Sequence, residues 1–119
     1  INASRKLQVS LQVHGIEKRF KPSVEMMLYR IVQELLNNIV KHADATKAIV
    51  QLIKDNEHLS LTVEDDGKGF KNNETVTANK AGLETVLSRV NYLNGNMQID
   101  SQEGVGTTVM MDFLNSPDA

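Results

Sequence analysis

The sequence contains no cysteine, and only two of its 119 residues are proline. Without cysteine, disulfide bridges, thiolate nucleophiles and cysteine zinc sites are excluded. No apolar run approaches the roughly 18 residues that suggest a membrane helix, and the opening residues INASRKLQ contain no apolar signal region. A basic excess, which duplex nucleic-acid binders usually show, is also missing, because 13 lysines and arginines face 15 aspartates and glutamates.

What the chain does contain is the material of one globular domain. Its 119 residues are 40% hydrophobic and 24% charged, which is enough for one core and too little for two. No linker, internal repeat or low-complexity tract divides it. We therefore expect a single soluble, cytoplasmic domain over residues 1–119. Because the sequence does not begin with methionine, we also expect a fragment of a longer protein.

The spacing of apolar residues predicts the order β-α-β-β-α-β-β. Alternation predicts strands and a 3.6-residue period predicts helices; the segments are a strand at 7–13, a helix from about 23 to 42, strands at 48–54 and 58–64, a helix at about 83–93, and strands at 97–101 and 107–114. The two pairs of adjacent strands read as antiparallel hairpins. This order predicts an α+β fold with helices packed on one face of a mixed, largely antiparallel sheet.

Three finer predictions concern the ends and faces of these elements. Leu7, Val9, Leu11 and Val13 alternate with polar residues, which predicts a half-buried first strand. Ser23 follows a proline and is predicted to cap the first helix. A glycine at position 95 is predicted to terminate the second helix.

The first helix carries an anomaly at its C-terminal end. Its apolar stripe consists of Val24, Met27, Leu28, Ile31 and Leu35. Continued by a turn and a half, that stripe arrives at Asn38 and His42, with Glu34 and Lys41 along one edge. Burying such groups without partners costs a few kcal/mol each. The pattern indicates either a polar cavity for a phosphate and a cation, or a helix end that emerges into solvent.

Glycine-rich segments supply further candidates. Asp65-Asp66-Gly67-Lys68-Gly69-Phe70 directly follows a predicted strand, and its two glycines allow backbone to pass close to a bound group. Asp65 could accept a hydrogen bond from an exocyclic amine, although such a segment is also typical of a turn. Gly82 opens the second helix, whose free N–H groups favour an anion. The segment 104–108 indicates either a hairpin or a hydroxyl in a ligand pocket.

Together these motifs resemble the GHKL ATP-binding superfamily. VQELLNNIVKHA resembles its N box, DDGKGF its G1 box, AGLETVLSRV a reduced G2 region, and GVGTTV its final glycine-threonine motif. The resemblance covers Leu7 to Phe113, and it is greatest to sensor histidine kinases of the short-lid, nitrate-sensor-like class. It implies the Bergerat fold, a two-layer α/β sandwich that holds ATP between helices and sheet.

The resemblance also implies roles for individual residues. At the adenine end, Asp65 matches the acid that accepts the adenine amino group, Gly67 and Gly69 the glycines beside the base, and Thr107 the threonine of the adenine–water–aspartate network. At the phosphate end, Asn38 matches the asparagine that binds Mg²⁺, and Lys41 and His42 match positions near the phosphates and ribose. Gly82 and Leu83 match the remnant of the lid hinge. Only residues 71–81 separate Phe70 from Gly82, which implies a short lid.

Glu34 departs from many histidine kinases, which have asparagine four residues before the Mg²⁺-binding asparagine. Glutamate stands there in gyrase-type and chaperone-type relatives, where it is a general base. Because Glu34 and Asn38 lie one helical turn apart, a base and a metal ligand could both face the γ-phosphate. No phosphoacceptor motif is present, and His14 and His58 are interpreted as surface residues.

The function that the resemblance implies is that of the catalytic domain of a sensor histidine kinase. Such a domain binds Mg·ATP and transfers the γ-phosphate to a histidine on preceding dimerisation helices, with a response regulator downstream. The full-length protein is expected to be a homodimer, with this domain in the cytoplasm and monomeric when isolated. The alternatives are an anti-sigma-type serine kinase, an ATPase clamp of the gyrase or mismatch-repair type, and a binding module without catalysis.

Overall fold

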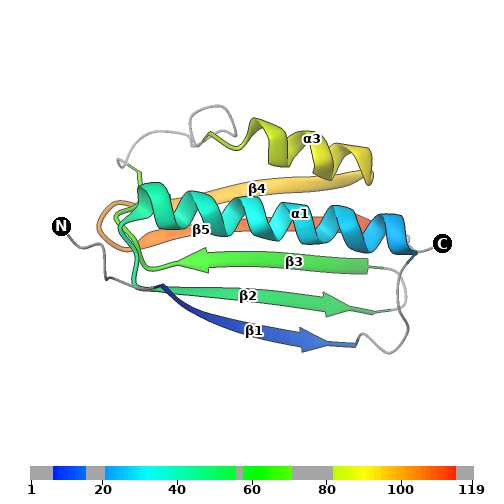
Figure 1. Cartoon of the computed structure of the whole chain (residues 1–119), viewed down its shortest axis with the longest axis horizontal. Helices are drawn as coiled ribbons and strands as arrows, with labels where there is room; N and C mark the ends of the chain where they lie inside the picture. The colour runs from blue at the N-terminus through cyan, green and yellow to red at the C-terminus, as the bar shows by residue number, and fades with distance from the viewer. Residues whose placement is uncertain (1–6, 16–20, 56–57, 71–81, 115–119) are drawn as a thin grey trace.

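The computed structural model describes residues 7–15, 21–55, 58–70 and 82–114 (Figure 1). Its elements, in order, are β1 (Gln8–His14), α1 (Pro22–Asn38), the π-helix η1 (Ile39–Ala43), β2 (Lys47–Lys54), β3 (His58–Asp65), α3 (Glu84–Tyr92), β4 (Gly95–Gln102) and β5 (Gly106–Leu114). The predicted order of strands and helices is confirmed.

The described strands form one five-stranded sheet in the order β1-β2-β3-β5-β4. β1 runs parallel to β2, and every other neighbouring pair is antiparallel. Figure 1 shows α1 and α3 on the same face of this sheet. The predicted α+β sandwich, with helices on one face of a mixed, largely antiparallel sheet, is therefore confirmed. Neither helix is long and apolar enough to cross a membrane.

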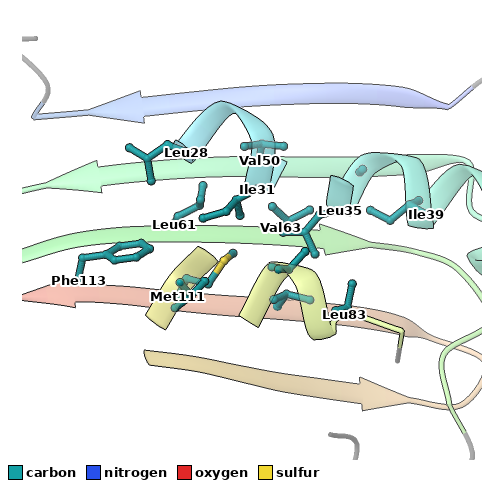
Figure 2. Packing of buried hydrophobic residues seen from close by; sticks show 14 of the residues in the cluster. Leu28, Ile31, Leu35, Ile39, Val50, Leu61, Val63, Leu83, Met111 and Phe113 are labelled. Carbon is teal, nitrogen blue, oxygen red and sulfur yellow. The ribbon is translucent and has the colours of Figure 1, made fainter. Parts of the chain in front are cut away.

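The core lies between α1 and the central strands (Figure 2). Val24, Leu28, Ile31 and Leu35 of the predicted stripe are buried, and Met27 is half-buried. They pack with buried residues of the sheet, which include Val50, Leu61, Val63, Met111 and Phe113. Each fully buried aliphatic side chain contributes about 1.5–3 kcal/mol, so this stripe fixes α1 against the sheet. The helix thereby carries its polar C-terminal end to the edge where β3 ends.

The prediction that the first strand is half-buried is wrong. Val9, Leu11 and Val13 are 48%, 68% and 46% exposed. They do point to the helix-bearing side, because Leu11 pairs with the buried Val50. β1 is, however, an edge strand, and Figure 1 shows neither helix lying over it. Alternation fixed the face of the strand but not whether a helix covers it.

Two predicted helix ends are also wrong. The N-cap of α1 is Lys21 rather than Ser23, with Pro22 at the first helical position, because the φ angle of proline favours that position. After α3, Asn94 adopts the left-handed conformation, with φ at 60°. Gly95 instead begins β4, where a Cβ would lie 2.4 Å from Cδ1 of Phe113. Glycine at position 95 therefore allows β4 to pack closely against Phe113 and does not terminate the helix.

The first helix extends about as far as predicted, but its last turn changes type. After Asn38 the backbone continues as the π-helix η1, which ends at Ala43 and is capped by Asp44 with φ at 54°. A π-turn is closed by i→i+5 instead of i→i+4 hydrogen bonds and takes more residues per turn than an α-helix, so the side chains beyond Asn38 shift around the helix axis. Single π-turns of this kind often occur at functional sites.

Candidate functional site

A cavity of about 770 Å³ lies at the end of the sandwich where α1 ends and β5 begins. Its volume falls within the range of small-molecule sites. The polar or glycine residues that line it are Asn38, Lys41, His42, Asp65, Lys68, Gly69, Gly82 and Thr107. The apolar lining consists of Leu35, Ile39, Ala43, Val63, Phe70, Leu83 and Val109. The far end of α1, the loop after β3, the start of α3 and β5 thus meet around one hollow.

Most of the residues selected from the sequence meet in this cavity. The ones that line it are Asn38, Lys41, His42, Asp65, Gly69, Gly82, Leu83 and Thr107. Gly67 and Glu34 are not among the residues that line the cavity. His14 and His58, interpreted as surface residues, are exposed on strands away from the cavity. The predicted short lid, residues 71–81, lies outside the described residues.

Asp65 provides a buried carboxylate at the sheet end of the cavity, with only 9% of the residue exposed. Its Oδ1 accepts a hydrogen bond of 2.8 Å from the N–H of Gly67, and the N–H of Thr107 donates a second one. Burial raises the pKa of Asp65 above its ordinary value, while these two bonds oppose the rise. A carboxylate has about four acceptor positions, so Asp65 keeps capacity for a donor inside the cavity.

The loop that follows Asp65 is held against the end of η1. A Cβ on Gly67 would lie 2.2 Å from the carbonyl oxygen of Ala43, and the N–H of Lys68 donates to that same oxygen at 2.8 Å. Only glycine fits this approach. Gly67 therefore does not line the cavity but lets the loop dock on the helix that carries Lys41 and His42.

The other side of the same loop is held by the β4–β5 hairpin. The N–H of Gly104 donates to the carbonyl oxygen of Lys68 at 2.7 Å. Gly69 has φ at +67°, and a Cβ there would lie 2.3 Å from the carbonyl oxygen of Gln102. A Cβ on Gly106 would lie 2.0 Å from the carbonyl oxygen of Asp65. The backbone around Asp65 is thus enclosed by backbone on both sides.

Asp66 fastens the end of β3 to the start of β2, a role that the sequence analysis did not assign. Its Oδ1 accepts from the N–H groups of Thr46 and Lys47, each at 2.9 Å, and its Oδ2 accepts from the Thr46 hydroxyl at 2.8 Å. These bonds lower the pKa of Asp66 to about 2. These three hydrogen bonds, here called the Asp66 clamp, also anchor the cavity wall because Asp66 adjoins Asp65.

The polar groups at the helix end of the cavity have fewer hydrogen-bond partners than those at the sheet end. Among the described side chains, Asn38 Nδ2 is buried with no hydrogen-bond partner, a state that costs about 1–3 kcal/mol. Lys41 and His42 are exposed and line the opening. Gly82 has φ at +72°, and no atom of the described residues lies within 4 Å of its Cβ position. This end therefore presents a cation and unpaired donors, which suits an anionic ligand.

Glu34 lies in the seam between α1 and α3. Its Oε1 is 3.7 Å from Nε of Arg89, and the two side chains are 30% and 28% exposed. That distance suits an ion pair but is too long for a hydrogen bond, and the buried Nε of Arg89 has no hydrogen-bond partner in the described part of the chain. Sequence reasoning missed Arg89, because no local pattern pairs residues so far apart along the chain.

Lys68 and Phe70 were also missed as lining residues. Both stand inside the glycine-rich segment that was singled out, so its position alone could have suggested them. The apolar lining residues carried no such signal, since they belong to ordinary helix and strand patterns.

Comparison with known proteins agrees with this geometry. Residues 23–117 match the sequence family described as histidine kinase-, DNA gyrase B-, and HSP90-like ATPase. The chain is 42% identical over 86 residues to the sensor histidine kinase LiaS of Bacillus subtilis (strain 168), covering 72% of the chain and 24% of LiaS. It is 35% identical over 97 residues to the signal transduction histidine-protein kinase/phosphatase DegS of the same strain, covering 80% of the chain and 25% of DegS.

A solved structure gives the same assignment. The blue-light activated histidine kinase of Erythrobacter litoralis EL346 matches with a TM-score of 0.72 and 27% identity, over 92% of this chain and 36% of that one. The chain belongs to the family of histidine kinase-, DNA gyrase B- and HSP90-like ATPases, as an ATP-binding domain of the sensor histidine kinase type. It spans about a quarter of the length of LiaS and DegS.

Proposed function

We propose that this chain is the catalytic domain of a sensor histidine kinase, which binds Mg·ATP and transfers its γ-phosphate to a histidine of another domain. The observation that carries the proposal is the cavity that brings Asp65 and Thr107 of the sheet together with Asn38, Lys41 and His42 of the helix end. One end offers a buried acceptor and the other offers cationic and unpaired donors. ATP has the complementary pair of ends, a base with an amino group and an anionic triphosphate.

At the sheet end, Asp65 would accept the hydrogen bond of the adenine amino group. The bonds from Gly67 and Thr107 hold its carboxylate before a ligand arrives, so little ordering cost remains for binding. Gly69 would allow the loop to pass close to the β4–β5 hairpin beside the base, and the Thr107 hydroxyl would join the same network. The carbonyl of guanine cannot donate to Asp65, which would favour adenine.

At the helix end, the donor set suits a metal-bound triphosphate. Mg²⁺ is bound mainly by phosphate oxygens and water in nucleotide sites, so one amide oxygen from the protein is enough. Asn38 would supply that oxygen, and its buried Nδ2 lacks a partner among the described residues. Lys41 and His42 would approach phosphates and ribose, with Gly82 and Leu83 at the lid hinge. When bound, Mg²⁺ would neutralise charge on the phosphates.

Glu34 would act as the general base for the transfer. It would accept the proton of the attacking histidine as the imidazole nitrogen bonds to the γ-phosphorus and the bond to the bridging oxygen of ADP breaks. In the present arrangement Glu34 pairs with Arg89 at 3.7 Å, so its carboxylate would have to turn toward the incoming histidine. An ion pair between side chains this exposed contributes at most about 1 kcal/mol, so rotating the Glu34 carboxylate away from Arg89 would cost little free energy.

The proposed setting is a longer cytoplasmic or membrane-anchored kinase. Residues 1–119 would form one domain of it, monomeric in isolation. The phosphoacceptor histidine would lie on preceding dimerisation helices, which would make the full-length protein a homodimer and pass the phosphate to a response regulator. The support for this setting is the length of the similar sensor kinases, of which this chain matches about a quarter.

Phosphate transfer with labelled ATP tests the proposal. The chain alone should gain almost no label, whereas adding the dimerisation helices of the full-length protein should place an acid-labile, base-stable phosphate on a histidine there. Glu34→Gln preserves shape but removes basicity, so transfer should fall by about 10²–10⁴-fold with ATP affinity unchanged. Glu103→Gln, at an exposed position of the β4–β5 turn, is the matched control and should transfer like the parent.

Other outcomes would select an alternative function. Acid-stable label on serine would favour the serine kinase, and rapid release of phosphate to water by the chain alone would favour the ATPase clamp. Parental transfer by Glu34→Gln would remove Glu34 from the mechanism while leaving the histidine kinase assignment intact.

A further inference from the structure

The hydroxyl of Ser101 stands at a junction behind the sheet end of the cavity. It accepts a hydrogen bond of 2.8 Å from the N–H of Phe70 and lies 2.9 Å from the hydroxyl of Thr107. A third contact, to the carbonyl oxygen of Gly106, measures 3.3 Å. Phe70 and Thr107 line the cavity, but Ser101 does not. Ser101 can therefore influence a bound ligand only through its neighbours.

The strand register explains how the two hydroxyls meet. Ser101 of β4 pairs directly with Thr107 of β5, and side chains of directly paired residues stand on the same face of a sheet. Thr107 also pairs with Asp65 on its other side. The three residues thus form a row across β4, β5 and β3, in which Ser101 is the outermost member.

The proton of the Ser101 hydroxyl has two possible acceptors, the Thr107 hydroxyl and the carbonyl oxygen of Gly106. A hydroxyl has one proton and two lone pairs, and the N–H of Phe70 occupies one lone pair of Ser101. Either hydroxyl of the Ser101–Thr107 pair could donate, and we assign Ser101 as the donor because Thr107 is the nearer acceptor for its proton, at 2.9 Å against 3.3 Å for the carbonyl oxygen of Gly106. With Ser101 as donor, the proton of Thr107 stays available to the cavity. In a β-branched residue such a bond also fixes χ1, which otherwise allows the hydroxyl to turn toward nearby backbone.

We propose that Ser101 is a positioning residue for base recognition, which orients the Thr107 hydroxyl toward the nucleotide without touching it. The inference rests on the proposed function, because it needs an adenine base beside Asp65 and Thr107. It concerns the base end of the ligand alone, since no phosphate-end residue contacts Ser101 among the bonds described above. Loss of the Ser101 hydroxyl should therefore weaken the hold on the base and leave the hold on the triphosphate unchanged.

Calorimetry of Ser101→Ala with two ligands separates these effects. Removing one neutral hydrogen bond should weaken ATP binding about three- to tenfold, while binding of magnesium tripolyphosphate, which has no base, should stay within about twofold of the parent. Ser101→Thr keeps the hydroxyl in a strand that tolerates β-branching and should restore ATP affinity. Ser60→Ala is the matched control, because Ser60 also donates to a side chain across the sheet, to Asp112 at 3.0 Å, but lies outside the cavity lining.

A double variant tests whether the effect passes through Thr107. Thr107→Val removes the hydroxyl and keeps the shape, so adding Ser101→Ala to it should cause no further loss of ATP affinity. A second loss of the same size in that background would overturn the proposal. So would parental ATP affinity in Ser101→Ala, or an equal loss of ATP and tripolyphosphate. If the parent chain binds no ATP, the proposed function itself fails, and this inference fails with it.

Discussion

The two ends of the cavity differ in how completely the protein fills them. At the sheet end, a Cβ on Gly67, Gly69 or Gly106 would lie 2.0–2.3 Å from a backbone oxygen, so the loop has no spare room. At the helix end, a Cβ on Gly82 would meet no described atom within 4 Å, and Asn38 Nδ2 has no hydrogen-bond partner among the described residues. The sheet end, where the base would bind (the base end), is therefore formed before a ligand arrives. The helix end, where the phosphates would bind (the phosphate end), has unpaired hydrogen-bonding groups that a ligand would pair.

This contrast matches the chemistry of the two halves of the proposed ligand. A base is rigid and is recognised by a few fixed hydrogen bonds, which preorganisation strengthens. A metal-bound triphosphate is flexible and highly charged, and exposed groups such as Lys41 and His42 can adapt to it. Rigid geometry would thus supply selectivity at one end, and charge would supply affinity at the other.

The largest expected difference between the two ends is in stability toward glycine substitution. Gly106→Ala adds a Cβ 2.0 Å from the carbonyl oxygen of Asp65 at φ of +146°, so unfolding free energy should fall by about 3 kcal/mol. Gly82→Ala, at φ of +72°, adds a Cβ with no described atom within 4 Å and should cost only about 1–2 kcal/mol. Urea unfolding of both variants measures this. Equal losses would contradict the contrast between a filled end and an open end.

The next effect concerns the metal at the helix end. Asn38→Ala removes the proposed amide ligand, so the enhancement of ATP binding by Mg²⁺ should disappear, while ATP binding without Mg²⁺ should stay near parental. Asn37→Ala, at the exposed neighbouring position on α1, is the control and should keep the enhancement. Titrations with and without Mg²⁺ measure both. Tight Mg²⁺ binding by the chain without nucleotide would contradict the proposed shared coordination.

The smallest effect is a pH dependence of the clamp beside the base end. The pKa of Asp66 is lowered from 3.8 to about 2, so its contribution to stability is complete above pH 4 and is lost as pH falls through 2. The melting temperature of Asp66→Asn should therefore lie below that of the parent at pH 6 and meet it near pH 2. A gap that stays constant over this range would show that the charge of Asp66 is not what fastens Thr46 and Lys47.

Local patterns were enough to predict much of this molecule. Alternating and helical spacing gave the element order, and the stripe from Val24 to Leu35 is buried as its period indicated. The glycine-rich segment could be predicted to lie at the cavity because close approach of backbone requires glycine, and the sequence shows the glycines directly. These features depend on neighbours in the chain, which a sequence displays directly.

Features that depend on distant partners were not predictable in this way. The exposure of Leu11 follows from which strands α1 happens to cover, and the pairing of Glu34 with Arg89 joins two helices. The π-turn after Asn38 leaves the apolar pattern almost unchanged, so periodicity does not reveal it. The Asp66 clamp joins residues separated by a whole hairpin. Each of these needs the tertiary arrangement before it can be recognised.

The most direct test of the account is calorimetric titration of the chain with Mg·ATP and with Mg·GTP. ATP should bind, and GTP should bind at least about tenfold more weakly, because adenine has an amino group at C6 where guanine has a carbonyl, which cannot donate to Asp65. Asp65→Asn should weaken ATP binding about ten- to hundredfold and narrow the preference for ATP. Equal affinity of the parent chain for ATP and GTP would contradict the assignment of Asp65 to the base and, with it, the orientation of the ligand in this cavity.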